Sequence, residues 1–341
     1  MKVAIHHRPG SFSDRWIKYC ENENIDYKLV NAFDTDIIEQ LKGYDVFMWH
    51  HHHSQIKDVL AAKNILFAIE HSGLRVFPDF KTSWHFDNKV AQKYLLEAAG
   101  IPIVPSYIFY DKKQAKKWAK NTSYPKVFKL TRGAGSSNVK LARTKSDAVK
   151  FINKSFGKGF PQLDRVGYLK EALRKSGKDT VSIDSLTNVL KGVTRLVFNS
   201  EFAKKQSPER DYAYFQDFIE NKGFDVRVVV IDNKAVALKR MVRENDFRAS
   251  GSGNLVFDND KIDKRYIELA FNVSDKLKTQ SLAIDLIHGI DDEIRVVEIS
   301  YGFPMLNFLE RSTGYWDKDI NWHESDLNLQ NWIIEGLLRD K

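Results

Sequence analysis

The stretch from Asp285 to Pro304 constrains the fold more than any other part of the 341-residue chain. It contains two apolar runs of β type, and each run carries one carboxylate, Asp285 in the first and Glu298 in the second. The pattern predicts two neighbouring strands that project two acids side by side. A hard cation such as Mg²⁺ prefers carboxylate oxygens and shares its other positions with phosphates. The pair therefore indicates a metal clamp, and a hairpin whose acids face water is the alternative.

The composition bounds the class of protein and its compartment. With 43% hydrophobic and 29% charged residues, the chain has the make-up of a globular protein, and its length predicts two or three lobes. The chain has no run of about 18 apolar residues and no signal-peptide pattern at its N-terminus. Cys20 has no second cysteine to pair with. We therefore expect a cytoplasmic protein, and peripheral association with the inner face of the membrane stays open.

The excess of positive charge raises the question of a polyanionic partner. The formal net charge is +8, and between Lys150 and Asp179 eight Lys or Arg residues stand against three acids. This basic insert fits either a solvated helical surface or contact with an anionic, lipid-linked substrate at a membrane surface. The chain has no zinc-ligand spacing, aromatic RNA-binding strand or helix-turn-helix pattern, so we expect no nucleic-acid partner.

The first 83 residues alternate short apolar runs with amphipathic ones. The pattern predicts strands at residues 2–6, 27–30 and 45–49 and helices at 14–23 and 34–42. Strands and helices that alternate with short connections form a parallel sheet, so we expect an α/β fold. In such sheets, ligands bind beyond the carboxyl ends of the strands.

Two unusual loops follow the first and third of these strands. Residues 6–11 read His-His-Arg-Pro-Gly-Ser, and residues 49–53 read Trp followed by four histidines. Four consecutive histidines do not converge on one metal ion, because neighbouring side chains of an extended segment point to opposite faces. Buried, hydrogen-bonded histidines are one reading of these loops. The other is substrate contact, for which the candidates are His7, Arg8, His51 and His52.

The remainder of the chain adds helices and a hairpin. A helix capped by an Asp ends at Gly100. A hairpin occupies residues 223–239 around the turn at Asp232 and Asn233, and helices lie at 263–278 and near the C-terminus. We expect four parts with the basic insert inside the third: residues 1–83, 84–124, 125–219 and 220–341.

A lysine precedes a loop rich in small residues. Residues 125–130 predict an apolar strand with Lys129 near its end, and residues 131–139 are rich in Gly and Ser. Such a loop exposes backbone N–H groups that can lie over phosphates. It is neither a Walker A motif nor a dinucleotide fingerprint, and a flexible hairpin is the alternative.

The order of these motifs along the chain carries a family resemblance. A Lys at a helix start, a Lys before a Gly/Ser loop, the segment YFQDFI, then GFDVR, Lys-Arg, Phe-Arg and two acids follow one another. This series resembles the ATP-grasp superfamily over nearly the whole chain. It looks most like the carboxylate-amine ligase branch, which includes glutathione synthetases and the enzyme that adds glutamate to a ribosomal protein. The chain also looks like a group of ATP-grasp proteins encoded with surface-polysaccharide genes. The resemblance implies an ATP-grasp fold with an N-terminal parallel-sheet domain.

The resemblance also implies roles for individual residues. Lys89 and Lys129 match the lysines that hold the ATP phosphates. Arg227 and Arg240 match arginines that reach the γ-phosphate and the acyl phosphate, and Arg248 matches one that contacts the substrate carboxylate. The residues that match the phosphate lid are Gly133, Gly135, Ser136 and Ser137. The residues that match the hinge reading the adenine edge are Gln216, Asp217, Phe218 and Ile219.

The implied metal ligands are Asp285, Glu298 and Ser300, and the third departs from the family pattern. Related chains usually have Asn where this chain has Ser300, and a hydroxyl is a poorer hard ligand than an amide carbonyl. The implied cofactors are ATP and Mg²⁺, with Mn²⁺ as an alternative metal.

The implied reaction joins a carboxylate to an amine through an acyl phosphate and releases ADP and phosphate. The likeness to the polysaccharide-linked group points to a sugar uronic acid or a polysaccharide precursor, joined to an amino acid or amine. The alternatives are a peptide or protein amino-acid ligase and a nucleotide-binding module without catalysis. A homo-oligomer is compatible with the sequence.

Overall fold

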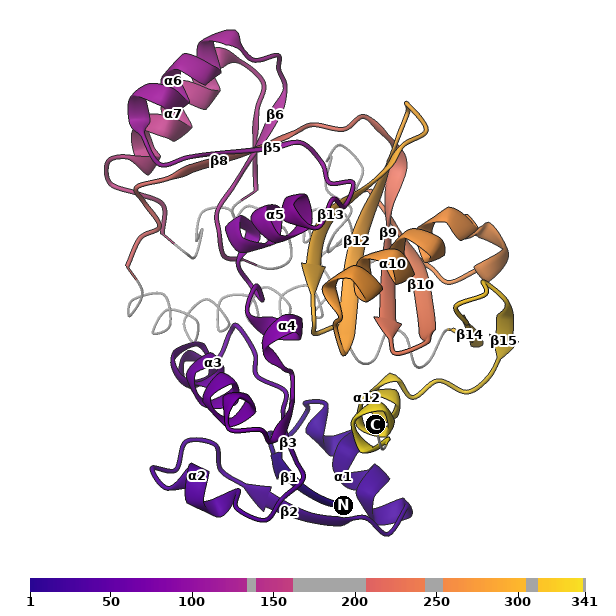
Figure 1. Cartoon of the computed structure of the whole chain (residues 1–341). Helices are drawn as coiled ribbons and strands as arrows, with labels where there is room; N and C mark the ends of the chain where they lie inside the picture. Colours follow the sequence, from indigo (N-terminus) through magenta and orange to yellow (C-terminus); the bar gives the residue numbers. More distant parts are fainter. Residues whose placement is uncertain (134–138, 162–206, 243–253, 305–311, 340–341) are drawn as a thin grey trace, which may run out of the picture. The chain divides into compact units, whose positions relative to one another are not determined.

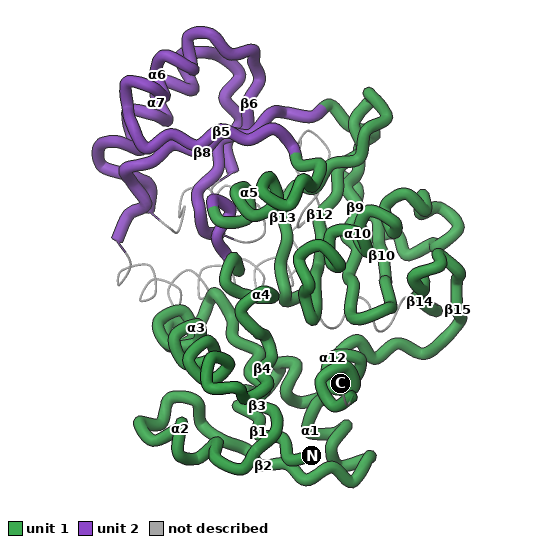
Figure 2. Tube along the Cα trace, viewed as in Figure 1, with its two compact units in different colours: residues 1–86, 91–103, 220–341 green, residues 87–90, 104–219 purple. Residues whose placement is uncertain are grey.

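The computed structural model describes residues 1–133, 139–161, 207–242, 254–304 and 312–339. Contacts divide the chain into two compact units (Figure 2). Unit 1 comprises residues 1–86, 91–103 and 220–341, and unit 2 comprises residues 87–90 and 104–219. The division into four parts stays a prediction. No helix in the described ranges is both long and apolar enough to cross a membrane.

Unit 1 begins with a four-stranded parallel sheet of order β2-β1-β3-β4 (Figure 1). Its strands are β1 (Lys2–His6), β2 (Asp26–Val30), β3 (Val46–Trp49) and β4 (Arg75–Phe77). Its helices are α1 (Ser13–Asn22), α2 (Ile37–Gln40), α3 (Ile56–His71) and α4 (Phe80–Ser83). The predicted parallel sheet is confirmed, and β4 and α3 extend it beyond the prediction.

The helix expected at residues 34–42 is much shorter in the structure. Only Ile37–Gln40 is helical. The side chain of Asp34 does not cap a helix there, because its carboxylate accepts hydrogen bonds from the side chains of Asn31 and Gln40. Side chains that bond locally in this way compete with helix formation.

The second sheet of unit 1 has seven strands in the order β13-β12-β9-β10-β14-β15, with β11 paired to β10. They are β9 (Asn221–Ile231), β10 (Lys234–Met241), β11 (Leu255–Val256), β12 (Ser281–Gly289), β13 (Ile294–Ser300), β14 (Gly314–Trp316) and β15 (Trp322–Glu324). Three helical segments accompany the sheet: η1 (Asn259–Lys261), α10 (Lys264–Leu277) and α12 (Leu329–Leu338). The predicted hairpin is confirmed as β9 and β10, with Asp232 at positive φ in its turn.

Alternation along β9 decides which residues face which layer. Val226, Val228 and Val230 pack with α10 in one apolar cluster. Val229 and Ile231 point to the other face, where they join a cluster that includes α1, α12 and the first sheet. Side chains two residues apart share a face. The charged residues that precede Val229 at the same spacing therefore lie on the face opposite α10.

Unit 2 contains a four-stranded antiparallel sheet of order β5-β8-β6-β7. Its strands are β5 (Ser106–Phe109), β6 (Lys126–Lys129), β7 (Lys140–Ala142) and β8 (Ala213–Asp217). The helices α6 (Lys112–Asn121) and α7 (Lys145–Ser155) cover one face through a shared apolar cluster. The helix α5 (Lys89–Ala98) contains one boundary between the units. The predicted basic insert begins in α7, and its residues 162–179 lie outside the described residues.

Candidate active site

A buried network of two acids and two arginines occupies one end of the β9–β12 face opposite α10. Arg227 and Asp285 are cross-strand partners on β9 and β12, and the guanidinium binds both carboxylate oxygens, at 2.7 and 2.9 Å. Arg240 binds Asp225 in the same way, at 2.6 and 2.7 Å. Its Nη2 also lies 2.9 Å from Asp285 Oδ2. Bidentate pairs of this kind fix geometry as well as charge.

The electrostatics of this network favour the ionised forms of Asp285 and Arg240. Burial alone opposes ionisation of Asp285, but Arg227 and Arg240 outweigh it and hold the pKa of that carboxyl well below its usual range. Burial likewise disfavours the charged form of Arg240, and the two neighbouring carboxylates more than offset it and raise the pKa of the guanidinium. For Asp225, by contrast, burial outweighs the attraction of Arg240 and raises the pKa of the carboxyl.

Glu298 stands opposite Asp285 on the neighbouring strand, as the sequence predicts. The two residues are cross-strand partners of β12 and β13, and the register shifts directly after Asp285. Directly opposed residues have side chains close enough to share a ligand, and bulges commonly re-aim side chains beside functional sites. Within the described residues, no group of three or more His, Cys, Asp or Glu side chains forms a metal site. Protein usually holds Mg²⁺ by one or two carboxylates together with substrate phosphates. Both oxygens of Asp285 already contact arginines, so the metal role of Asp285 and Glu298 stays a prediction.

Ser300 lies on the same face of β13 as Glu298, but its hydroxyl has a local partner. The hydroxyl donates to the carbonyl of Gly302 at 2.9 Å and accepts from the N–H of Gly302 at 3.2 Å. The hydroxyl therefore already makes two hydrogen bonds within its own turn. Its role as a metal ligand stays a prediction.

In unit 2, the sheet face opposite α6 and α7 is polar. Lys129, Tyr214 and Gln216 share this face and are all buried. Gln216 Nε2 donates to the Ser106 hydroxyl at 3.0 Å. It also lies 3.4 Å from the Tyr214 hydroxyl. Nucleotide contacts of Lys129 and Gln216 stay a prediction. Tyr214 was not anticipated from the sequence.

Asp217, predicted to read the adenine edge, lies on the other face of this sheet. It is the cross-strand partner of Lys126, whose Nζ lies 2.5 Å from Asp217 Oδ1. The Lys126 side chain is 5% exposed and the Asp217 side chain 26%, so the lysine is buried and the carboxylate is partly exposed. Phe218 and Ile219 follow the strand and are half-buried. Nucleotide contacts for these three residues stay a proposal.

Lys89 anchors the first described residues of the predicted lid. Its Nζ donates to the carbonyl of Gly133 at 2.8 Å, and its backbone N–H donates to the carbonyl of Thr131 at 3.0 Å. The N–H of Gly133 donates to Asp87 at 3.1 Å. The other predicted lid and catalytic residues, Gly135, Ser136, Ser137 and Arg248, lie outside the described residues.

The N-terminal loops place the four predicted substrate residues in different environments. His7 contacts the Ser13 hydroxyl at 3.0 Å, and the backbone of His52 donates to Asp58 at 2.7 Å. His51 is buried, and burial lowers its pKa to about 3, so its ring is neutral. Arg8 is half-buried, and Nη2 lies 3.4 Å from the carbonyl of His50. The Nε2 of His51 is buried and has no hydrogen-bond partner among the described residues, and substrate contact by these four residues stays a prediction.

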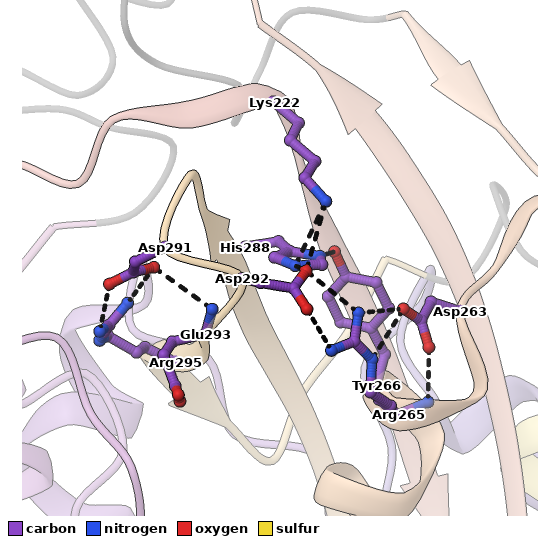
Figure 3. Close-up of polar contacts among 9 residues, drawn as sticks. All are labelled: Lys222, Asp263, Arg265, Tyr266, His288, Asp291, Asp292, Glu293 and Arg295. Carbon is purple, nitrogen blue, oxygen red and sulfur yellow. Dashed lines mark hydrogen bonds and ion pairs between the residues drawn. The ribbon is translucent and has the colours of Figure 1, made fainter.

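A second charged cluster surrounds the turn between β12 and β13 (Figure 3). Asp292 accepts from His288 at 2.7 Å and from Arg265 at 3.0 Å, and Tyr266 contacts the other ring nitrogen of His288 at 3.1 Å. His288 is three residues after Asp285 on β12 and so points to the opposite face of the sheet. This cluster ties the turn to α10 and thereby fixes the hairpin that carries both acids.

Sequence reasoning missed the partners that complete these groups. Asp225 lies inside the GFDVR segment, two residues before Arg227, and that spacing on a strand places both on one face. Lys126 lies in the strand of Lys129, but its partner Asp217 is 91 residues away. The position of Asp225 beside Arg227 was detectable from local alternation. The contact of Lys126 with Asp217 could be found only from the pairing of β6 with β8.

Comparison with known proteins identifies the class. Residues 187–319 match the family model of the RimK-like ATP-grasp domain. The α-aminoadipate–LysW ligase LysX of Saccharolobus solfataricus is 25% identical over 239 residues, which cover 70% of this chain and 69% of that protein.

Solved structures agree on the fold. The ATP-grasp ligase PsnB with its minimal precursor has a TM-score of 0.56 at 12% identity, over 99% of this chain and 98% of that one. A RimK domain protein from Sphaerobacter thermophilus has a TM-score of 0.51 at 14% identity, over 88% and 90%. The biotin carboxylase domain of the Hydrogenobacter thermophilus 2-oxoglutarate carboxylase, solved with MgADP, has a TM-score of 0.58 at 13% identity, over 100% and 70%.

These matches confirm the predicted ATP-grasp fold and ligase class, whereas the likeness to the surface-polysaccharide group stays a prediction. Residues 187–319 therefore match a RimK-like ATP-grasp domain, and the similarity to an α-aminoadipate–LysW ligase over 70% of the chain supports the predicted carboxylate-amine ligase branch.

Proposed function

We propose that the protein joins a carboxylate to an amine in an ATP-dependent reaction that passes through an acyl phosphate and releases ADP and phosphate. The observation that supports this most directly is the buried network of Asp225, Arg240, Asp285 and Arg227, with Glu298 beside it. Phosphoryl transfer needs little covalent help from protein, because positioning and charge neutralisation supply most of the catalysis. A set of preorganised arginines and carboxylates provides both.

The two arginines are suited to phosphate oxygens. Arg227 and Arg240 each hold carboxylates through Nε and Nη2. Among the described residues, neither Nη1 has a protein partner, so each guanidinium keeps donors for an anionic ligand. Because the carboxylates fix their orientation, the arginines need no reorganisation when charge develops on a transferred phosphoryl group.

Mg²⁺ would be held by Asp285 and Glu298. A divalent cation held there would supply positive charge to offset the phosphate charge during transfer. Lys89, Lys129 and Gln216 are the nucleotide contacts that we propose in unit 2, and all three side chains are buried. Arg248 is proposed to contact the substrate carboxylate and lies outside the described residues.

For the substrates, amino acids or polypeptides have more support than sugars. The LysX relative is named for joining α-aminoadipate to LysW, and PsnB was solved with a precursor peptide. No feature of the described residues favours the uronic-acid or lipid-linked substrate that the polysaccharide likeness implies. We therefore propose an amino acid or peptide as one substrate. Uronic acids are included among the compounds tested.

Phosphate release with ATP and Mg²⁺, measured against panels of carboxylates and amines, tests this function. The panels contain amino acids, acidic peptides and uronic acids. We expect release only when a carboxylate and an amine are both present, and loss of release in Asp285→Asn and Glu298→Gln. Glu293→Gln is the matched control, because Glu293 is an exposed acid in the turn of the same hairpin. Full release in the first two variants would disprove the metal assignment. Nucleotide binding without release for any pair would instead favour a non-catalytic module.

A further inference from the structure

The first sheet of unit 1 has a topological switch point that the proposed function leaves without a role. In the order β2-β1-β3-β4, the chain leaves β1 toward one edge of the sheet and returns through β3 on the other side. Ligands of open α/β sheets bind outside the carboxyl ends of the strands at this point. Arg8 follows β1 and His50 follows β3, so these two residues flank it.

Arg8 has donor capacity that the described protein does not use. Its Nε is withdrawn from water and has no hydrogen-bond partner in the described structure. Its Nη2 lies 3.4 Å from the carbonyl of His50, which is a long contact for a guanidinium. Among the described residues, no acid forms an ion pair with Arg8 within 4.0 Å. A half-buried guanidinium with an unpartnered donor and no acid within ion-pair distance is complementary to an anion.

The two ring nitrogens of His50 face different parts of unit 1, one the loop after β1 and the other Gly302. Its Nδ1 accepts the backbone N–H of Phe12 at 3.2 Å, so the ring carries its proton on Nε2. The ring is stacked on Phe12 with a centroid distance of 3.7 Å. Nε2 lies 3.5 Å from the point that a Cβ of residue 302 would occupy. Glycine at position 302 therefore places no side chain against this donor.

The nearby acids accept backbone N–H groups and form no hydrogen bond with Arg8, although Arg8 attracts the buried carboxylate of Asp58 electrostatically. Asp14 accepts from Gly10 at 2.8 Å, and Asp58 accepts from His52 at 2.7 Å. His51 is buried and neutral. Arg8 thus places positive charge at the strand ends that form the switch point, and Lys63 acts on His51 from the side of α3.

The switch point is also continuous with the strand that carries a proposed metal ligand. Ser300 is the last residue of β13, and Tyr301, which follows it, donates from its hydroxyl to the carbonyl of His51. Phe303 packs on Phe12 with ring centroids 4.8 Å apart. The end of β13 therefore lies against both N-terminal loops, within unit 1.

We propose that Arg8 and the Nε2–H of His50 form a subsite for a carboxylate group of the substrate, one that does not itself react. This inference rests on the proposed ligase function and adds a substrate class, namely compounds with a second acidic group. The fork of the arginine binds two carboxylate oxygens, which a lysine cannot do. The neutral histidine adds one donor and sets the orientation of the group.

Binding without ATP tests the subsite separately from the reaction. The probes are glutarate, adipate and their monomethyl esters, which differ from the diacids by one anionic group, and inorganic phosphate as the alternative anion. Calorimetry on the full chain is expected to show tighter binding of a diacid than of its ester. Arg8→Gln should weaken diacid binding about 10-fold or more and abolish this preference. Arg8→Lys should restore it only in part.

Two further variants test the His50 donor and the space beside it. His50→Phe keeps the ring stack on Phe12 but removes the donor, and Gly302→Ala adds a methyl group beside Nε2 without removing any charge. Both should weaken diacid binding more than ester binding. Arg15→Ala is the matched control, because Arg15 is a half-buried arginine on α1, away from the strand ends. Urea unfolding of each variant identifies those that fail to fold.

The outcomes separate the subsite from the ligase function. Diacid binding that depends on Arg8, without phosphate release for any amine, supports the subsite and overturns the ligase proposal. Phosphate release with an unchanged KM for diacids in Arg8→Gln and Gly302→Ala overturns the subsite and keeps the ligase. Failure of wild-type protein to prefer any diacid over its ester, or tighter binding of phosphate than of every diacid, also overturns the subsite.

Discussion

Arg227 and Asp285 occupy opposed positions on β9 and β12, and the guanidinium binds both oxygens of the carboxylate. The Asp285 side chain is 11% exposed, so removing its charge leaves Arg227 and Arg240 without their shared partner in a poorly solvated place. We expect Asp285→Asn to lower the free energy of unfolding by about 3 kcal/mol and to abolish ATP-dependent phosphate release. Urea denaturation and a phosphate assay measure the two effects.

The exposed pair of Asp263 and Arg265 is the control for this prediction. Their side chains are 37% and 47% exposed. We expect Asp263→Asn to change the free energy of unfolding by less than about 1 kcal/mol, because water screens such pairs. Equal losses of unfolding free energy in the two aspartate variants would show that the buried network contributes no more to stability than an exposed pair.

Buried neutral histidines make stability depend on pH. Burial lowers the pKa of His51 to about 3 and that of His85 to about 4. In the unfolded chain their pKa is about 6.5, so the unfolded state takes up protons first as the pH falls. Stability is thus fully present above about pH 6.5, and each histidine removes about 1.4 kcal/mol per pH unit between about pH 6 and pH 4.

Urea denaturation between pH 7.5 and pH 4.5 checks this effect. His51→Leu should reduce the slope of unfolding free energy against pH by about 1.4 kcal/mol per unit, since one titrating group is lost. His71, an exposed residue at the end of α3, provides the matched control. The idea fails if His71→Gln flattens the slope as much as His51→Leu does.

Local patterns were enough to predict several parts of the structure. The strand at residues 2–6, the hairpin of β9 and β10, and the register of Asp285 with Glu298 all follow from alternation within short segments and from nearby turns. In each case the partners are close in sequence, so the pattern itself carries the contact.

Contacts between distant strands could not be predicted in this way. Lys126 and Asp217 are 91 residues apart, and nothing in either segment specifies the other. The same holds for the contact of Tyr301 with His51, which joins residues 250 positions apart. The neutral state of His51 likewise depends on burial by remote segments, which one sequence does not reveal.

The buried Lys126 and the partly exposed Asp217 should be strongly coupled. We expect Lys126→Met to lower the free energy of unfolding by about 3 kcal/mol, because it leaves Asp217 unpaired. The double variant with Asp217→Asn should lose less than the sum of the single variants, by about 1 to 3 kcal/mol. Lys145→Met, at an exposed position of α7, is the control. Additive losses would contradict the pairing.

Ser300 offers a test of metal binding that keeps the fold intact. Its hydroxyl is occupied by Gly302, so we expect Ser300→Ala to leave the Mg²⁺ dependence of phosphate release unchanged. Ser300→Asn introduces an amide carbonyl beside Glu298, and carbonyl oxygens are good ligands for hard cations. It should lower the Mg²⁺ concentration for half-maximal release roughly tenfold, which corresponds to about 1.4 kcal/mol in metal affinity. A Mg²⁺ titration at saturating ATP measures both. If Ser300→Ala raised the Mg²⁺ concentration needed for half-maximal release, the hydroxyl would itself bind the metal. Its hydrogen bonds with Gly302 would then have to break when Mg²⁺ binds.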